Sequence, residues 1–216
     1  MPTMPAPLPR TAKIITIINL KGGVGKTHLT WVLAGVSQEQ KQRTLLIDTD
    51  TQANLTNSFI DPADDKPGVE QLFNPAADRD VLPLIRRTAF DHLDIIPASS
   101  RLTRFDLADR AQWEDTDLHL SLVDPLADLR SAYDLVLIDC PPRLSVVSYA
   151  ALCASDFVVV PLEAADWGAQ GVVAVTAAVN EVRTKYNARL ALLGYVVSRF
   201  KRARAYQQAY LKQLRQ

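Results

Sequence analysis

"KIITIINLKGGVGKT", residues 13–27, is the stretch that decides the fold. It begins with a short apolar run rich in β-branched residues, which is typical of a buried strand. Three glycines, two lysines and a threonine follow. Glycines allow backbone N–H groups to curl around phosphate oxygens, and the start of a helix adds a positive dipole end. The stretch therefore predicts a strand, a phosphate-binding loop and a helix in succession.

The loop supplies seven consecutive candidate nucleotide contacts, which are Gly22, Gly23, Val24, Gly25, Lys26, Thr27 and His28. In this pattern the lysine, Lys26, neutralises β- and γ-phosphates and the Thr27 hydroxyl ligates Mg²⁺. Counted back from Gly25, the pattern G-x-x-x-x-G-K-[ST] puts Leu20 where the first glycine belongs. Lys21 comes next, so the sequence predicts a deviant P-loop with a second lysine at its front edge.

Two later apolar runs end in aspartates. "TLLIDTD" (44–50) carries Asp48 and Asp50, which face the same way on an extended segment. "LVLIDCPP" (135–142) places Asp139 at a strand end, before two prolines that stiffen the next loop. A magnesium–phosphate site needs one carboxylate to organise the metal and another to orient the attacking water. These three aspartates are the candidates for those roles.

The remaining pattern alternates buried apolar strands with helices. Strands are expected at 13–18, 44–50, 93–98, 133–142, 156–163 and 190–198, and a loop at 61–68. Helices are expected at 27–40, 69–73, 80–87, 101–111, 117–131, 144–154, 168–185 and from about 202. This order predicts an α/β fold of the P-loop NTPase class, with a mostly parallel twisted sheet and helices on both faces. Ligands bind at the edge where such strands end.

Length and composition predict one domain. The chain has 216 residues, 48% of them hydrophobic, so one domain over residues 13–216 can bury a sizeable core. The proline-rich residues 1–12 are expected to form a flexible tail, since they lack the apolar segment of a signal peptide. No apolar run reaches the roughly 18 residues of a membrane span. Cys140 and Cys153 form no metal or disulfide framework, which fits a reducing cytosol.

Charge is distributed unevenly along the chain. The formal net charge is zero, yet residues 182–216 hold nine Lys or Arg and no Asp or Glu. On a helix from about residue 202, a basic stripe faces away from Tyr206, Tyr210 and Leu214. Such a stripe is either a solvated face or a binding surface for phosphate, and a membrane surface needs a more apolar opposite face. The candidate DNA-binding residues are Arg199, Lys201, Arg202, Arg204, Lys212 and Arg215.

Four pieces of the sequence resemble the ParA/MinD family of deviant Walker ATPases, and most of all its ParA (Soj-like) branch. They are "KGGVGKT" (21–27), "LLIDTDTQANLT" (45–56), "YDLVLIDCPP" (133–142) and "DFVVVPLEAADWGAQG" (156–171). The resemblance implies ATP and Mg²⁺ as cofactors. It also implies that Lys21 reaches across a nucleotide-sandwich homodimer to the ATP of the second chain.

The resemblance also implies roles for the other site residues. Lys26 is catalytic alongside Lys21, and Asp50 activates water. On the metal side it implies Thr27 as the direct ligand, with Asp48 and Asp139 as the carboxylates.

The same resemblance implies a slow, partner-stimulated ATPase that binds non-specific double-stranded DNA and partitions plasmids or chromosomes. Its partner would be a ParB-like centromere-binding protein or a cargo adaptor, and its place the cytoplasm, on the nucleoid. Three alternatives remain open: a MinD-like regulator on the membrane, a ParA-like positioner of protein cargo, and a nucleotide-gated scaffold without turnover.

Several positions depart from the family's pattern. His28 stands where a second Thr or Ser is usual, Thr51 replaces a proline, and Arg143 follows the two prolines where a small or polar residue is common. The family normally has another strand and helix beyond the position of Gln216, and its adenine-facing asparagine is not evident here. Trp167 opens a helix with a valine stripe, for which core packing is favoured over a partner surface.

Overall fold

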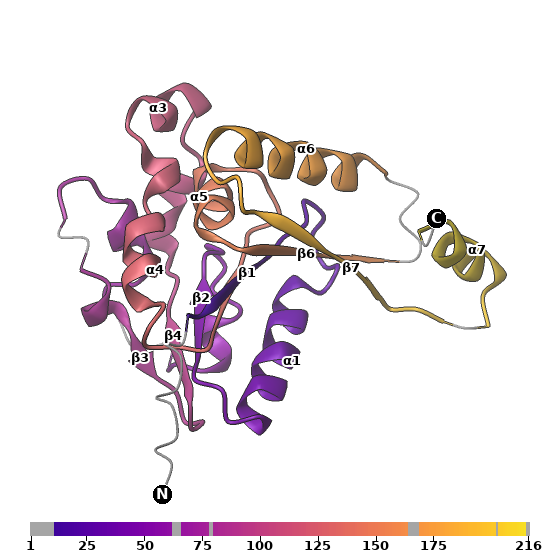
Figure 1. Ribbon diagram of the computed structural model, residues 1–216, viewed down its shortest axis with the longest axis horizontal. Coiled ribbons are helices and arrows are strands. Elements are labelled where there is room, and N and C mark those ends of the chain that lie inside the picture. The colour runs from indigo at the N-terminus through magenta and orange to yellow at the C-terminus, as the bar shows by residue number, and fades with distance from the viewer. Residues whose placement is uncertain (1–10, 62–65, 78–79, 164–168, 202, 215–216) are drawn as a thin grey trace, which may run out of the picture.

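The computed structural model describes residues 11–61, 66–77, 80–163, 169–201 and 203–214. Its centre is a seven-stranded sheet with the order β3-β4-β2-β5-β1-β6-β7 (Figure 1). Every neighbouring pair is parallel except β3 and β4. The strands are β1 (Lys13–Ile17), β2 (Thr44–Asp48), β3 (Arg86–Arg87), β4 (Leu93–Ile96), β5 (Leu135–Asp139), β6 (Phe157–Glu163) and β7 (Ala191–Ser198).

All six expected strands are present, and the predicted mostly parallel sheet is confirmed. The expected ends were too long in places: β2 stops at Asp48, and β5 spans only five residues. The seventh strand, β3, was missed because the segment 80–87 was predicted to be helical. That segment instead forms a 3₁₀ helix at Leu82–Leu84, followed at once by the two-residue antiparallel strand β3.

Helices cover both faces of the sheet, as predicted. Helix α1 (Lys26–Glu39) lies on one face, and α4 (Val123–Leu129), α5 (Val146–Ala154) and α6 (Ala169–Lys185) lie on the other (Figure 1). Two separate cores follow from this. Ile47 and Ile138 belong to the core under α5 and α6, while Leu46 and Leu137 belong to the core with α1. Alternate residues of each strand point to opposite faces.

Two expected helices are broken into shorter pieces. The segment 101–111 forms a 3₁₀ helix at Ser100–Leu102, α2 (Thr103–Asp106) and the start of α3 (Arg110–Asp115). The segment 117–131 forms a 3₁₀ helix at Leu118–Leu120 and then α4. The expected helix at 69–73 is also a 3₁₀ helix. The last helix is α7 (Ala205–Leu214), which starts three residues later than expected.

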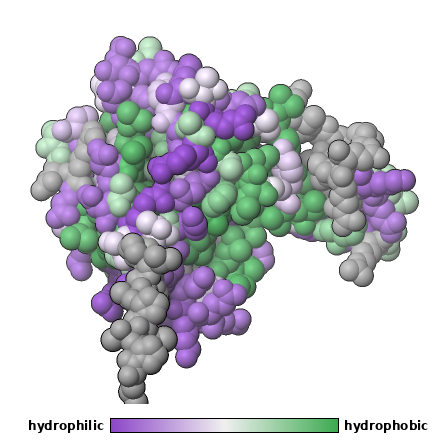
Figure 2. Space-filling view, in the orientation of Figure 1, coloured by the Kyte–Doolittle hydropathy of each residue, from purple (hydrophilic) through white to green (hydrophobic). Residues whose placement is uncertain are grey.

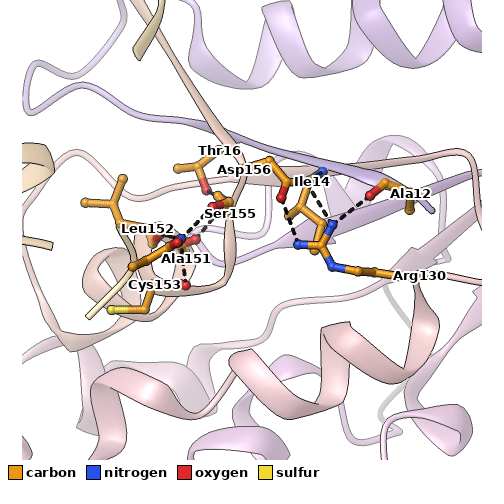
Figure 3. A network of polar contacts seen from close by, with 10 residues as sticks. Ala12, Ile14, Thr16, Arg130, Ala151, Leu152, Cys153, Ser155 and Asp156 are labelled. Atoms are coloured by element: carbon orange, nitrogen blue, oxygen red, sulfur yellow. Dashed lines mark hydrogen bonds and ion pairs between the residues drawn. The ribbon is translucent and has the colours of Figure 1, made fainter. Parts of the chain in front are cut away.

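A polar network fastens the edge of the sheet where the parallel strands begin (Figure 3). Arg130 donates to both carboxylate oxygens of Asp156, at 2.8 and 3.0 Å, and to the carbonyl of Ala12 at 2.8 Å. Asp156 also accepts from the Ile14 N–H at 2.9 Å. Beside it, the Asn187 amide donates to the carbonyls of Leu152 and Cys153, in the last turn of α5, and to that of Ser155, which follows the helix. These bonds tie α4, α5 and the starts of β1 and β6 together.

The two lateral edges of the sheet are built differently. At one edge, β3 is two residues long and consists of arginines. At the other edge, β7 runs for eight residues without a charge, and Leu193 and Tyr195 are exposed. Figure 2 shows hydrophobic side chains gathered over this side and over α1, where Val32 and Val36 are exposed. Charge and short length protect an edge strand from pairing, so β3 is protected and β7 is not.

Some sequence predictions fall outside the described residues, namely residues 1–10 of the tail, Trp167, Arg202 and Arg215. Ala12, which was assigned to the tail, is buried and its N–H donates to the Arg130 carbonyl at 2.9 Å. Both cysteines are free and buried. Among the described residues, no helix combines the length and apolarity that crossing a membrane requires.

Candidate functional site

The glycine-rich loop joins the end of β1 to the start of α1, as the sequence predicts. Gly23 and Gly25 have φ angles of 76° and 93°, a left-handed conformation that glycine adopts without strain. Gly25 directly precedes the helix, so the first N–H groups of α1 face the loop without intrahelical partners. Val24 is fully buried, and its carbonyl accepts from the Ser198 hydroxyl at 2.8 Å. The end of β7 therefore holds the loop in place.

Lys26 lies buried at this loop, with only 7% of its surface exposed. Its ammonium donates to the Lys21 carbonyl at 3.2 Å. Burial lowers the pKa of Lys26, and the nearby charges of Asp139, Cys140 and Asp50 act in the opposite direction. A buried ammonium with one carbonyl partner can donate further hydrogen bonds, and oxyanions are its strongest acceptors. This geometry suits a phosphate.

Asp139 ends β5 beside the first turn of α1. The Thr27 hydroxyl lies near enough to act to lower the pKa of Asp139, and the Thr30 hydroxyl lies 3.5 Å from Oδ1. The other oxygen, Oδ2, is buried and has no hydrogen-bond partner among the described residues. Burial first, and then the charge of Asp48, raise the pKa of Asp139 to about 8. A buried carboxylate oxygen without a partner is costly, and a cation would relieve that cost.

Asp48 has a different environment from Asp139. Its Oδ1 accepts from the Asp50 N–H at 3.0 Å, and its Oδ2 accepts from both the N–H and the hydroxyl of Thr56 at 2.8 Å. Burial raises its pKa to about 6, although these hydrogen bonds act to lower it. Both oxygens are thus occupied by the loop that follows β2. Asp48 thus holds the loop after β2 in position, and its carboxylate adds negative charge beside Asp139.

Asp50 lies beyond the end of β2, so the expectation of one extended segment through both acids was wrong. Its backbone carbonyl accepts from the Ala53 N–H at 2.9 Å, and its Oδ1 accepts from the Gln52 N–H at 3.0 Å. Asp50 is therefore held in a turn at the mouth of the site. The same turn gives Ala53 a left-handed φ of 52°.

Lys21 stands at the front of the loop with half of its side chain exposed. Its ammonium is 3.5 Å from Oε2 of Glu163, at the end of β6. Oε1 of the same glutamate pairs with Arg199 at 2.7 Å. Sequence reasoning missed Glu163, although an acid at the end of a strand beside β1 was a usable signal. It also missed Thr30, Thr56 and Ser198.

The basic C-terminal residues are placed only in part as predicted. Arg199 has a left-handed φ of 51°, and the Lys201 N–H donates to the Gln207 side chain at 2.6 Å. The chain therefore turns before α7, so Lys201 and Arg204 precede the helix and cannot belong to a stripe along it. Lys201, Arg204 and Lys212 are exposed. Their role in DNA binding stays a prediction.

Metal binding at the site depends on few protein ligands. No cluster of three or more His, Cys, Asp or Glu able to hold a metal occurs within the described part of the chain. Thr27 and Asp139 lie together, with Asp139 Oδ2 unpartnered there. Mg²⁺ typically takes one or two protein oxygens and fills its other positions with water and phosphate. The residues present therefore fit a magnesium–nucleotide site.

The chain matches known proteins over most of its length. Residues 12–192 match the model of a family described as an AAA domain. The chromosome partitioning protein ParA of Myxococcus xanthus is 32% identical over 190 residues, which are 87% of this chain and 65% of that protein. The sporulation initiation inhibitor protein Soj of Bacillus subtilis is 33% identical over 189 residues, which are 86% of this chain and 72% of that protein. This chain thus spans less than two thirds of the M. xanthus protein.

Solved structures share the same fold. A crystal structure described as cobyrinic acid a,c-diamide synthase from Mycobacterium smegmatis with bound ADP and magnesium has a TM-score of 0.84 and 28% identity. That match covers 94% of this chain and 81% of the other. A plasmid partition protein from Borrelia burgdorferi has a TM-score of 0.78 and 28% identity, with 95% of this chain and 86% of the other covered.

Proposed function

This chain belongs to the ParA/MinD family of P-loop ATPases, and on that basis we propose that it is a Mg²⁺-dependent ATPase that works as a dimerising switch in DNA partition. Two similar proteins support this by name, a chromosome partitioning protein and a plasmid partition protein. A third similar protein holds ADP and magnesium in its crystal structure. The ligands, partners and cargo of this chain are part of the proposal.

The observation that carries the proposal is the buried ammonium of Lys26 beside an unpartnered oxygen of Asp139. Among the described residues, Lys26 has only the Lys21 carbonyl as a hydrogen-bond acceptor. In the proposed complex it binds the β- and γ-phosphates of ATP, while N–H groups of residues 22–28 surround the phosphate chain. Bringing a phosphate to this lysine replaces a weak neutral acceptor with a charged one.

Thr27 and Asp139 would hold the magnesium ion. When bound, the ion neutralises phosphate charge and polarises the terminal phosphate. Asp48 contributes negative charge next to Asp139 and fixes the loop that carries Asp50 through its bonds to Asp50 and Thr56. We propose that Asp50, in the turn after β2, orients the attacking water.

Lys21 is proposed to act on the ATP of a second copy of the chain. Its ammonium is at the surface and 3.5 Å from Glu163, which already pairs with Arg199. Exposed ion pairs of this kind are worth about 0–1 kcal/mol, so little opposes the exchange of a carboxylate for a phosphate. The exchange is favourable only while a triphosphate is present, which makes ATP the condition for dimerisation.

The dimer is proposed to bind double-stranded DNA without sequence preference. Two copies double the number of exposed cations near α7, and phosphate contacts alone suit such binding. The proposed contacts are Arg199, Lys201, Arg204 and Lys212, with Arg202 and Arg215 outside the described residues. A ParB-like protein bound to plasmid or chromosome DNA would stimulate ATP hydrolysis. Hydrolysis would then release the protein from the DNA of the nucleoid into the cytoplasm.

The test is binding to a random-sequence DNA duplex with ATP, with ADP and without nucleotide, across a salt series. We expect binding only with ATP, with an affinity that falls steeply as salt rises. Lys26→Ala should abolish it by losing nucleotide. Lys21→Ala should keep ATP but lose both the dimer and DNA binding. A Lys21→Ala variant that still dimerises with ATP would remove the role of Lys21 in the second site.

A matched pair of variants tests the DNA-binding surface. Arg204→Ala should keep the ATP-dependent dimer and weaken DNA binding at every sequence tested, with a smaller salt dependence. Arg189→Ala removes another exposed arginine, just before the start of β7, and should change nothing. Equal loss in both variants would show a general charge effect rather than a defined surface. If the protein bound no DNA with any nucleotide but did bind anionic liposomes, the proposed DNA surface would be wrong and a membrane would be the binding partner.

A further inference from the structure

A cavity lies beside the loop that follows Asp139, and no residue of the glycine-rich loop lines it. It measures about 380 Å³ and sits between the α2–α3 segment and the first turn of α5. The polar and aromatic side chains in its wall are Asp106, Asp109, Arg110, Trp113, Arg143, Ser145 and Tyr149. Nothing in the proposed function uses this cavity.

Two buried acceptors at this cavity have no partner. The Asp106 side chain is 1% exposed, and its Oδ2 pairs with Arg143 Nε at 3.2 Å. Its Oδ1 is buried and accepts no hydrogen bond from any described residue. The Ser145 hydroxyl, at the N-cap of α5, is also buried and unpartnered within the described part of the chain. Unpaired buried oxygens are costly, and both would accept hydrogen bonds from a ligand.

The charge around the cavity favours a cation. Among the lining residues, two aspartates balance two arginines. Arg110, however, is already paired with Glu114 at 2.7 Å and with Glu181. Glu181 also pairs with Lys185 at 2.8 Å. Together these groups are four acids (Asp106, Asp109, Glu114 and Glu181) against three bases (Arg110, Arg143 and Lys185), which leaves one negative charge in excess. The carboxylates of Asp106 and Asp109 would repel an anionic ligand and attract a cationic one.

The aromatic side chains suit a planar cation. Arg110 already lies over the rings of Trp113 and Tyr149, with its central carbon 5.4 and 5.2 Å from the ring centroids. Flat guanidinium groups stack on such rings while their N–H groups remain free to donate. A compact ammonium gains less from this environment.

We propose that this cavity binds the guanidinium group of an arginine side chain presented by a partner protein. The guanidinium N–H groups donate to Asp106 Oδ1 and to the Ser145 hydroxyl, the two acceptors left unpaired. The site is independent of the glycine-rich loop in its ligand and in its residues. Arg143 belongs to its wall and follows Asp139 by four residues, across Pro141 and Pro142.

Occupancy of the cavity would act on the loop that carries Asp139. The Arg143 carbonyl accepts from the Ser148 hydroxyl at 2.6 Å, and its side chain is held by Asp106. A second guanidinium at Asp106 competes with Arg143 for that carboxylate. This consequence for the nucleotide site rests on the proposed function, whereas the binding itself does not.

The experiment is a titration of the nucleotide-free protein with N-acetyl-arginine methylamide, followed by NMR of the backbone amides and the Trp113 indole. The matched control ligand is the citrulline analogue, which keeps the shape and loses the charge. We expect the arginine probe to shift Ser145, Tyr149 and Trp113, and the citrulline probe to bind about tenfold more weakly. Equal binding of the two probes, or no shifts with either, overturns the proposal.

Variants assign the binding to the two acceptors. Asp106→Asn should weaken the arginine probe about tenfold, and Asp115→Asn, an exposed acid at the end of α3 outside the cavity, should not change it. Ser145→Ala gives a second test that leaves the Asp106–Arg143 pair intact, and a several-fold loss is expected. Undiminished binding in Ser145→Ala and Asp106→Asn, each folded by circular dichroism, would overturn the assignment. Because nucleotide is absent, failure of the ATPase proposal would not affect the result.

Discussion

The two ends of the parallel strands treat charged side chains in opposite ways. Where the strands begin, Asp156 accepts three hydrogen bonds from Arg130 and Ile14 (Figure 3). Where they end, Asp139 keeps a buried oxygen without a partner in the described residues, and the buried Lys26 donates to a single carbonyl. The first end is complete as it stands, and the second is complete only with a ligand. The groups where the strands begin therefore stabilise the fold, whereas the groups where they end lower its stability and leave hydrogen bonds available for a ligand.

The pKa values of the two carboxylates express the same contrast. Burial raises the pKa of Asp156, but hydrogen bonds from Arg130 and Ile14 outweigh it and the pKa is lowered overall. At Asp139, burial dominates and the charge of Asp48 adds to it, so the pKa rises to about 8. The fold favours the charged form of one acid and disfavours that of the other.

The largest expected effect is on binding at the incomplete end. Lys26→Ala should weaken ATP affinity by roughly 100-fold or more, because a buried charged donor to phosphate is lost. The free energy of unfolding without nucleotide should not fall, since a buried ammonium is removed. Calorimetric titration with ATP and Mg²⁺, together with urea unfolding, measures both. Lys13→Ala, at the other end of β1, is the control and should bind ATP normally. If Lys26→Ala lowered the free energy of unfolding by as much as it weakened the free energy of ATP binding, the contrast between the two ends would be wrong.

The next effect is on stability at the complete end. Arg130→Met should lower the free energy of unfolding by about 2–3 kcal/mol, because it leaves Asp156 without its charged partner. ATP affinity should be unchanged. Arg189→Met removes an exposed arginine with no side-chain partner in the described structure and should cost about 0.5 kcal/mol or less. Thermal and urea unfolding of both variants give the answer, and equal stability of the two would show that the network in Figure 3 contributes little.

A smaller effect of opposite sign is expected at the two ends of β5. Asp139→Asn should raise the free energy of unfolding by about 1–2 kcal/mol without nucleotide. Burial and the charge of Asp48 raise the pKa of Asp139 to about 8, so near neutral pH this carboxyl must take up a proton on folding, and the substitution removes that cost. It should also abolish Mg²⁺-dependent hydrolysis. Asp134→Asn, just before the first residue of β5, should lower stability, because Asp134 accepts from the Arg43 N–H at 2.9 Å. Differential scanning calorimetry of the pair tests the sign, and a loss of stability in both would contradict the comparison.

The smallest effect is a pH dependence at the complete end. The pKa of Asp156 is lowered on folding, so its ionised form stabilises the protein above the ordinary pKa of 3.8. This contribution is lost as pH falls from about 4 through the folded-state pKa. The stability advantage of the wild type over Asp156→Asn, about 1 kcal/mol at pH 6 to 7, should therefore shrink below pH 4. Urea unfolding at a series of pH values measures it, and an advantage independent of pH would exclude this cause.

The sequence was sufficient for the sheet and the glycine-rich loop. Strands such as 13–17 and 135–139 are short apolar runs bounded by glycine or proline, a pattern with few alternative structures. The edge strand β3 could not be found this way, because Arg86–Arg87 is too short and too charged for a strand signal. The segment 101–111 carried a helical pattern, yet it is divided between α2 and α3 at residues 107–109.

The site was predictable in its residues but only partly in their environments. Spacing placed Lys26, Thr27 and Asp139 near one another, because Lys26 and Thr27 follow β1 and Asp139 ends the adjacent strand β5. The bonds that occupy the two oxygens of Asp48 come from the Asp50 N–H and from Thr56, eight residues on, and depend on how that loop folds. The Glu163 contact depends on β6 lying next to β1, which strand order determines and local pattern does not.

The strand order also determines how long each strand waits during synthesis for the strands that pair with it. Strand β1 lies between β5 and β6, so its two neighbours are made long after it. At about 5–20 residues per second, the ribosome needs roughly 6–24 s to reach β5 after finishing β1. During that interval the apolar residues 14–18 have neither strand to pair with. The nascent chain thus leaves the ribosome with the interior strand β1 uncovered, and chaperones that bind short apolar segments have their best opportunity there.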